Sequence, residues 1–217
     1  MGEEITLFEA LRTQRSVRSF TDEPVPDEAI ERILEAASWA PNAGNRQLWE
    51  FVVIRDAEVK RALGAIYRRA MSLLEESLPS ERPAADPRTK QSSMMKASDN
   101  LADNMGSVPV IIVVGFDRSG LPYSTDGAFK GFTAETVYTG AMPAVQNLLL
   151  AARALGLGTC LTTVANLWEG KVKELLGIPP QIQVVTLIPM GYPAGRLATF
   201  PPVKRIPASE KIHRDHW

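Results

Sequence analysis

The chain has 217 residues, enough to bury one sizeable core, so we expect a single domain over 1–217. Its 24 lysine and arginine residues nearly balance its 25 aspartate and glutamate residues, so it lacks the net charge that attracts nucleic acid or an anionic membrane. The single cysteine, Cys160, excludes an internal disulfide framework and a multi-cysteine metal site, and no apolar run approaches membrane-spanning length.

The N-terminal stretch predicts a helix followed by a basic motif. The first four residues, Met-Gly-Glu-Glu, lack the basic and apolar regions of a signal peptide, so we expect a cytoplasmic protein. Thr6 and Glu9 form a capping-box pattern, and apolar residues then recur at helical spacing. Arg15 and Arg18 follow with a hydroxyl, that of Ser16, between them, and guanidinium forks match phosphate or carboxylate oxygens. The motif suits a phosphorylated cofactor, although a basic helix end alone is the commoner explanation.

A second predicted helix, between Pro26 and Pro41, leads into a loop and an apolar strand. Loop 40–49 is rich in Asn, Gly and Ala, which let the backbone approach a flat ligand while the amides supply donors and acceptors. A plain helix-to-strand turn explains the same composition and, taken alone, is the simpler interpretation. Strand 51–54 is continuously apolar, so we expect it in the middle of a covered sheet.

The middle of the chain contains a change of composition. A third helix is predicted over 59–73, and residues 79–93 then turn to proline, serine and charge. Because core-like segments flank this stretch, we expect an excursion over 79–105 rather than a linker between domains. Its methionine-rich end, 94–105, predicts a loosely amphipathic helix that serves either ordinary packing or an adaptable substrate lid.

The C-terminal half alternates predicted strands and helices. Strands are predicted over 109–115 and 183–189, with a short β-like segment over 156–164. Helix 134–155 is apolar nearly all round, so we expect it to be buried, at a position typical of a subunit interface. Asn166 and Glu169 predict a capped helix that ends at Gly177. From Pro193 the chain is proline-rich and polar, and we expect an arm over 193–217 that wraps a partner subunit.

In this order, the segments resemble those of the nitroreductase family of FMN-dependent oxidoreductases. The resemblance covers about residues 7–207, and its matching pieces are QRSVRSF, APNAGNRQLWEFVVI, PVIIVV, QNLLLAARALGLGT, LTT, LIPMGYP and VKRIP. It implies an α+β fold with a central, mainly antiparallel sheet flanked by helices. It also implies an intertwined homodimer with FMN at the interface and the C-terminal arm around the other subunit.

The resemblance further implies which residues hold FMN. Arg15, Ser16 and Arg18 would contact the cofactor, with Arg18 near the pyrimidine edge of the ring. Arg205 would pair with the phosphate. A loop of the partner subunit would line the same flavin, and a segment of this chain would lie along the ring near N5. The loop consists of Pro41, Asn42, Ala43 and Asn45, and the segment consists of Leu161, Thr162 and Thr163.

The activity that the resemblance implies is a ping-pong reaction with a small-molecule substrate. NADH or NADPH would reduce FMN and leave, and an oxidant such as a nitroaromatic or a quinone would take its place. Flavin carries such chemistry itself, so we expect no catalytic side chain and no metal. Consistent with this, both histidines lie in a charged tail, and Cys160 has the apolar context of a small buried hydrophobe. Another flavin enzyme on this scaffold, such as a reductive dehalogenase, and a non-catalytic FMN-binding protein remain the alternatives.

Three departures from the family pattern refine this expectation. The LTT and MGYP segments look most similar to the iodotyrosine-deiodinase-like branch, but Met71 and Glu75 occupy the positions of its substrate-binding Glu and Tyr. Deiodination is therefore not expected. Gln14 stands where the family usually has a second Arg, so the phosphate site has one positive charge fewer. Leu48 replaces the common Pro before Trp49, which weakens the resemblance at that turn.

Overall fold

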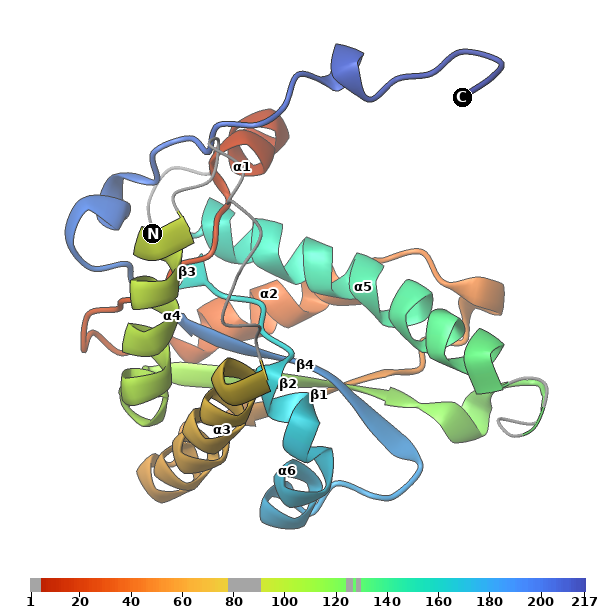
Figure 1. The fold of residues 1–217 in the computed structure, drawn as a ribbon, viewed down its shortest axis with the longest axis horizontal. Helices are drawn as coiled ribbons and strands as arrows, with labels where there is room; N and C mark the ends of the chain where they lie inside the picture. Colours follow the sequence, from red (N-terminus) through yellow and green to blue (C-terminus); the bar gives the residue numbers. More distant parts are fainter. Residues whose placement is uncertain (1–4, 78–90, 124–126, 128–129) are drawn as a thin grey trace.

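The fold is built on one antiparallel sheet. The structure is a computed structural model that describes residues 5–77, 91–123, 127 and 130–217, and all of their side chains except those of 91–95 and 130. The four strands are β1 (Trp49–Ile54), β2 (Val110–Asp117), β3 (Gly158–Thr159) and β4 (Ile182–Gly191). They lie in the order β1-β2-β4-β3, and every neighbouring pair is antiparallel (Figure 1). The predicted α+β fold is confirmed.

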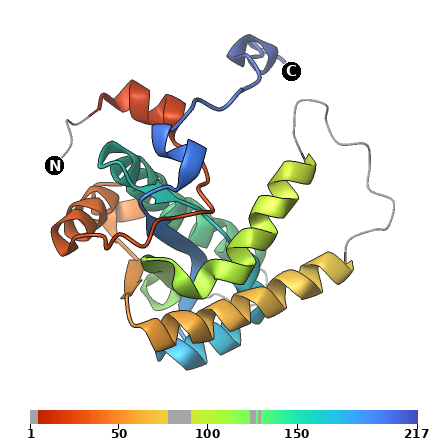
Figure 2. The same cartoon turned by 90° about the vertical axis from the view of Figure 1, so that its left-hand side faces the viewer.

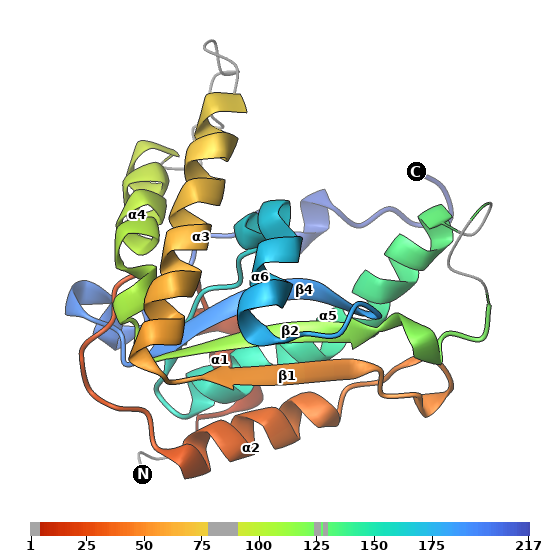
Figure 3. The ribbon, with the colours of Figure 1, turned by 90° about the horizontal axis from the view of Figure 1, so that it is seen from below.

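Helices cover both faces of this sheet. They are α1 (Leu7–Thr13), α2 (Asp27–Ser38), α3 (Ala57–Ser77), α4 (Gln91–Asn104), α5 (Lys130–Ala154) and α6 (Glu169–Leu176). Figure 3 shows α3, α4 and α6 on one side of the sheet and α2 on the other, where α5 packs against α2. Ile112 and Ile188 face the α2–α5 layer, whereas Ile111 and Leu187 face the α3–α6 layer. The sheet is thus buried between two apolar cores, which is why β2 and β4 are apolar along nearly their whole length.

The expected place of the first strand was wrong. β1 is an edge strand of the four-stranded sheet, and β2 and β4 occupy its centre. Glu50 and Val53 of β1 are exposed, whereas every residue of β2 from Val110 to Phe116 is buried. An apolar run indicates that helices cover a strand on its faces, but it does not tell whether hydrogen-bonded neighbours lie on both of its sides.

The two predicted helix caps behave differently. Thr6 accepts a hydrogen bond from the backbone N–H of Glu9 at 3.2 Å, so the cap of α1 is confirmed. The cap predicted at Asn166 is wrong, because its amide instead donates to the backbone carbonyls of Val184 and Val185 in β4. Glu169, the first residue of α6, accepts from the N–H of Val184 at 3.0 Å. Tertiary bonds to the sheet have replaced the local capping bonds.

The predicted excursion lies partly outside the described residues. Of the expected lid over 79–105, residues 79–90 are not described. Residues 1–4, on which the expectation of no signal peptide rested, are not described either. The remaining part is α4, which lies beside α3 (Figure 2). Leu101 and Met105 are buried in the α3 layer, so the C-terminal end of this segment belongs to the core.

The long helix α5 is buried over its second half and partly open over its first. Val145, Leu148 and Ala152 are almost fully buried. Phe132 and Tyr138, nearer its N-terminus, are 53% and 39% exposed. None of the described helices is both long and apolar enough to cross a membrane.

The C-terminal arm starts on the body of the molecule and then leaves it. Ala194 donates a backbone hydrogen bond to Ser19 at 3.0 Å, and Phe200 is buried beside Arg153. Residues 204–217 are all exposed, and Figure 1 shows this part extending away from the sheet above α5.

Candidate functional site

The basic motif leaves α1 as an extended strip that pairs with the sheet. Ser16 forms a parallel bridge with Thr159, and the N–H of Val17 donates to the carbonyl of Thr159 at 2.8 Å. The strip lies so close to β3 that a Cβ added to Gly158 would come within 2.7 Å of the Val17 side chain. Backbone pairing therefore fixes the positions from which Arg15 and Arg18 project.

Three other guanidiniums lie near enough to act on the charge of Arg15, and we call Arg15, Arg18, Arg196 and Arg205 the arginine cluster. Burial lowers the pKa of Arg15, and the positive charges of Arg196, Arg18 and Arg205 lower it further. Arg15 donates from Nη1 to the carbonyl of Pro201 at 3.0 Å. Its Nε is buried and has no hydrogen-bond partner among the described residues. A cluster of this kind is suited to an anion.

Arg196 is the member of the cluster that the sequence did not predict. It lies in a short 3₁₀ turn, Gly195–Thr199, about 180 residues downstream of the basic motif. No local pattern marks it, since a single arginine after Gly195 is typical of any exposed turn. Only the path of the arm brings it to Arg15.

The Leu161–Thr163 segment is held by β4 and by a tyrosine. The N–H and the carbonyl of Thr162 pair with Leu187 at 3.0 and 2.9 Å. The hydroxyl of Thr162 lies 3.1 Å from that of Tyr67 in α3, and both residues are buried. Burial raises the pKa of Tyr67, so the phenol is neutral and can donate this bond. Thr163, in contrast, is exposed.

Tyr67 was also not predicted as part of this site. Its side chain reaches Thr162 across 95 positions of sequence. A helical pattern in α3 marks it as a core residue, but no pattern tells that its hydroxyl meets the Leu161–Thr163 segment. We could have expected only that a buried phenol requires a partner.

The single cysteine has the environment that the sequence predicted. Cys160 is 2% exposed and is free of any disulfide. Burial raises the pKa of its thiol, although nearby Arg18 and a hydrogen bond with Ser16 act in the opposite direction. The thiol is therefore protonated and packs as a small apolar group.

The Asn42 loop, Pro41–Gln47, is folded around one amide side chain. Asn42 accepts a hydrogen bond from the N–H of Gln47 at 2.8 Å and donates to the carbonyl of Ala40 at 3.3 Å. Gly44, Asn45 and Gln47 have φ values of 62°, 50° and 52°, a region that glycine and asparagine tolerate best. The side chains of Ala43 and Asn45 are exposed.

A cavity of about 760 Å³ opens between this loop and the first half of α5. Its size lies in the range of small-molecule sites, and it has an aromatic lining. Phe116, Tyr123 and Phe132 line it, together with Asn42 and Ala43 of the loop. The rings of Tyr123 and Phe132 lie 5.3 Å apart.

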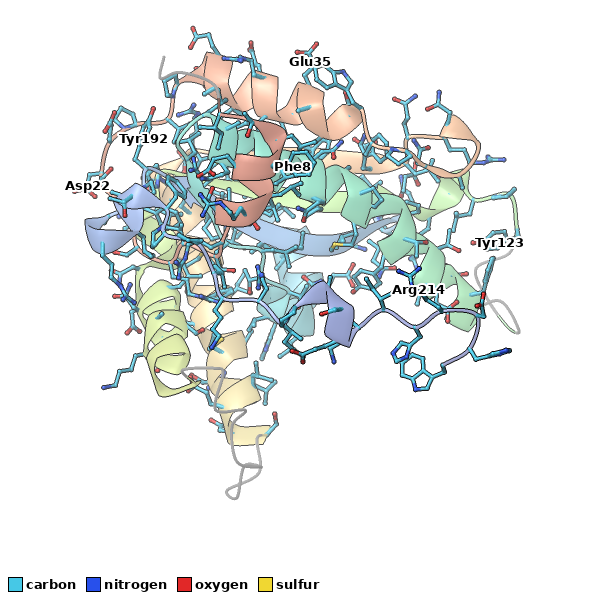
Figure 4. All side chains as sticks on the ribbon, turned by 90° about the horizontal axis from the view of Figure 1, so that it is seen from above. Phe8, Asp22, Glu35, Tyr123, Tyr192 and Arg214 are labelled. Carbon is cyan, nitrogen blue, oxygen red and sulfur yellow. The ribbon has the colours of Figure 1, made fainter. Side chains whose placement is uncertain are left out.

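The predicted cofactor residues thus form two groups, which lie at opposite ends of the folded subunit. Gly140 borders the cavity, whereas Arg153 donates to Thr13 at the end of α1. These two residues of α5 are 13 positions apart, about 20 Å along a helix. Figure 4 agrees, with Tyr123 at one end and Asp22 and Tyr192 at the other. The arginine cluster and the Leu161–Thr163 segment share one end, and the Asn42 loop does not join them within this chain.

Similarity to known proteins identifies the family of this chain. The model of the nitroreductase family matches residues 11–192. A provisionally named NADH dehydrogenase/NAD(P)H nitroreductase of Archaeoglobus fulgidus is 30% identical over 207 residues, which cover 94% of this chain and 95% of that protein. Iodotyrosine deiodinase 1 of Rattus norvegicus is 28% identical over 198 residues, which cover 91% of this chain and 65% of that longer protein.

Solved structures show the same fold. A provisionally named nitroreductase of Desulfovibrio desulfuricans, in complex with FMN, is 27% identical with a TM-score of 0.67, and the match covers 99% of each chain. An oxidised iodotyrosine deiodinase bound to FMN and 3-iodo-L-tyrosine is 23% identical with a TM-score of 0.71, over 98% of this chain and 100% of that one. With a family model matched over most of its length, the chain belongs to the nitroreductase family.

Proposed function

We propose that this protein is an FMN-dependent oxidoreductase that takes hydride from NADH or NADPH and passes it to a small oxidant by a ping-pong mechanism. A nitroaromatic or a quinone is the class of oxidant we expect. The observation that carries the proposal is the arginine cluster with the unpartnered, buried Nε of Arg15. It lies where the family resemblance assigns the flavin phosphate, and NAD(P)H nitroreductases are among the similar proteins.

The cluster fits the phosphate end of FMN. Arg15 and Arg205 carry charge of the right sign, and a guanidinium binds phosphate oxygens through paired N–H groups. An anion would supply the partner that the Nε of Arg15 lacks. The chain contains no Gly-x-Gly-x-x-Gly pattern for a dinucleotide, which favours FMN over FAD.

The ring of the flavin would lie along the Leu161–Thr163 segment. When bound, FMN supplies the hydride and electron chemistry, and the protein supplies binding and orientation. Arg18 would place a fixed positive charge near the pyrimidine edge. Because the hydroxyl of Thr162 already meets Tyr67, Thr163 is the threonine whose exposed side chain is available to the N5 edge.

We further propose that the active unit is a homodimer. Pro41, Asn42, Ala43 and Asn45 would serve the flavin of the partner subunit, since they cannot reach the arginine cluster of their own chain. Apolar side chains are exposed on the face that carries α1 and α2, including Phe8 at 81% and Trp39 at 72%. Phe8 and the α2 residue Glu35 both lie on the face seen in Figure 4. Burial of this surface in a dimer is the simplest explanation for its composition.

A reductive dehalogenase is the second candidate, because iodotyrosine deiodinases are among the relatives. Met71 opposes it: the position where that branch has its substrate-binding Glu holds a side chain that is 7% exposed and packs in the core. The third candidate is a flavin-binding protein without catalysis. The rate at which NAD(P)H reduces the flavin distinguishes it from the proposed oxidoreductase.

The identity of the cofactor tests the proposal. The purified protein should be yellow, and heat denaturation should release a flavin that co-elutes with FMN in chromatography. Arg15→Gln protein prepared in the same way should retain much less flavin, whereas Arg61→Gln, on the exposed side of α3, should retain the wild-type amount. Release of FAD, or of no flavin, would contradict the proposal.

A further inference from the structure

The start of the arm is tied to the basic strip at two places. The N–H of Ala194 donates to the carbonyl of Ser19 at 3.0 Å. Arg15 donates to the carbonyl of Pro201 at 3.0 Å. Arg196 lies between these ties in sequence, so its backbone runs close to the strip that carries Arg15.

A buried aromatic ring fixes the same turn from its other end. Phe200 ends the turn in the left-handed region, at φ 46°, and is only 7% exposed. The guanidinium of Arg153 lies 4.0 Å from the centre of its ring, and this arginine also donates to Thr13 at 2.8 Å. Arg153 thereby links the turn to both α1 and α5, so the backbone that carries the exposed Arg196 has a defined position near Arg15.

The charges that act on Arg15 from the described residues are all positive. Arg196, Arg18 and Arg205 all act on it, and none of the charges that act on it within the described part of the chain is a carboxylate. The Nε of Arg15 is buried without a hydrogen-bond partner among these residues. Gathering like charges around a buried unpaired donor is unfavourable, and an anion with several acceptor oxygens removes both costs.

We propose that Arg196 is an anion-binding residue that joins Arg15 and Arg205 around a phosphate monoester, the terminal phosphate of FMN. This inference rests on the proposed function and adds to it a residue that the family resemblance does not assign. A phosphate monoester carries a charge of about −1.5 to −2 at neutral pH and three strong acceptor oxygens, so it can engage several guanidiniums at once. Arg196 therefore contributes to selection of FMN over the uncharged riboflavin.

Flavin binding to matched variants tests this role. The full-length protein is stripped of flavin, and the dissociation constants of FMN and riboflavin are measured by flavin fluorescence. Arg196→Gln should weaken FMN binding about tenfold, the loss typical of a charged hydrogen bond, and leave riboflavin binding unchanged. Arg196→Lys should recover most of the loss, and FMN binding by Arg196→Gln should depend less on salt. Arg61→Gln is the control, since Arg61 lies on the exposed side of α3.

The outcomes separate this inference from the proposed function. Wild-type protein that binds neither flavin would contradict the proposed function itself. Wild-type protein that binds FMN, with Arg196→Gln unaffected or equally weakened for both flavins, would overturn only the role of Arg196. If Arg196→Gln lowers the thermal unfolding midpoint, the FMN and riboflavin dissociation constants are measured for Arg196→Met instead, which keeps the aliphatic stem.

Discussion

The hydroxyls of Thr162 and Tyr67 help to fix the position of the Leu161–Thr163 segment. Their oxygens lie 3.1 Å apart in a buried environment, and the backbone of Thr162 is bonded to β4 on both its N–H and its carbonyl. Thr186 also donates its hydroxyl to the carbonyl of Thr162 at 2.9 Å. Thr162 is therefore immobilised, and it presents the neighbouring Thr163 to the open side of the segment.

Replacing Tyr67 with Phe should destabilise the protein with little change in shape. The substitution removes one partner of a buried hydrogen bond and leaves the hydroxyl of Thr162 without it, at a cost of about 1–2 kcal/mol in the free energy of unfolding. Guanidinium denaturation of the flavin-free protein measures the change, with Tyr138→Phe on the exposed part of α5 as the control. Equal stability of Tyr67→Phe and wild type would show that the pair contributes nothing.

Replacing Arg18 with Gln should lower the midpoint potential of bound FMN. Reduction adds negative charge to the flavin, and two unit charges about 4 Å apart interact by about 4 kcal/mol at an effective dielectric constant of about 20. For a two-electron couple this corresponds to at most about 90 mV. Arg18 is only half-buried, so we expect solvent to reduce the shift to about 30 mV.

Potentiometric titration of fully loaded protein measures that shift. Arg15→Gln provides the contrast, because it should weaken FMN binding while leaving the potential of bound flavin nearly unchanged. An unchanged potential in loaded Arg18→Gln protein would show that the Arg18 charge is directed elsewhere.

Arg153 determines how the elements around the site are joined. From the last turn of α5 it donates to Thr13 of α1 and stacks on Phe200 of the arm. Three segments that are distant in sequence meet at this one guanidinium. The position of Arg196 and the tie from Arg15 to Pro201 depend on this junction.

Arg153→Met should therefore loosen the arm. The loss of one hydrogen bond and one cation–π contact should cost about 1–2 kcal/mol in the free energy of unfolding. Denaturation at fixed protein concentration measures it, and limited proteolysis should cut earlier near residue 200 than in wild type. Arg61→Met is the matched control, since Arg61 lies on the exposed side of α3, where it forms a 3.5 Å ion pair with Glu58. Wild-type stability and proteolysis of Arg153→Met would contradict this view of the junction.

Most elements could be predicted from local signals, and the exceptions have a common physical cause. The Thr6 cap and the end of α6 at Gly177 depend on neighbouring residues alone and were predicted. The edge position of β1 and the bonds of Asn166 to β4 depend on partners far away in sequence. The same applies to the site, where Arg15 belongs to a local motif and Arg196 does not.

The molecule as a whole presents half of the proposed site at each end. Phe8 and Leu7 of α1, 81% and 63% exposed, lie near the arginine-cluster end, and the Asn42 loop with its aromatic cavity lies at the other. Sequence patterns could indicate both halves but not their separation, which follows from the length of α5. In the proposed dimer, the arginine-cluster end of one subunit would meet the Asn42 loop of the other.

Phe8→Lys should weaken the dimer and reduce flavin content together. A charge on an exposed side chain leaves the fold of one subunit intact but disfavours burial against a partner. Sedimentation velocity at micromolar concentration, with flavin absorbance recorded in parallel, measures both. Leu167→Lys, 55% exposed on the segment before α6, is the control and should sediment as wild type does. A flavin-loaded wild-type monomer would contradict the shared site.

The rate at which a nicotinamide reduces the bound flavin tests the central claim most directly. FMN-loaded protein is mixed anaerobically with NADH or NADPH in a stopped-flow instrument, and the visible absorbance of the flavin is followed. The proposed oxidoreductase predicts rapid bleaching by at least one nicotinamide, followed by recovery of the absorbance when a quinone or a nitroaromatic is added. Flavin that stays oxidised for minutes with both nicotinamides would contradict the account.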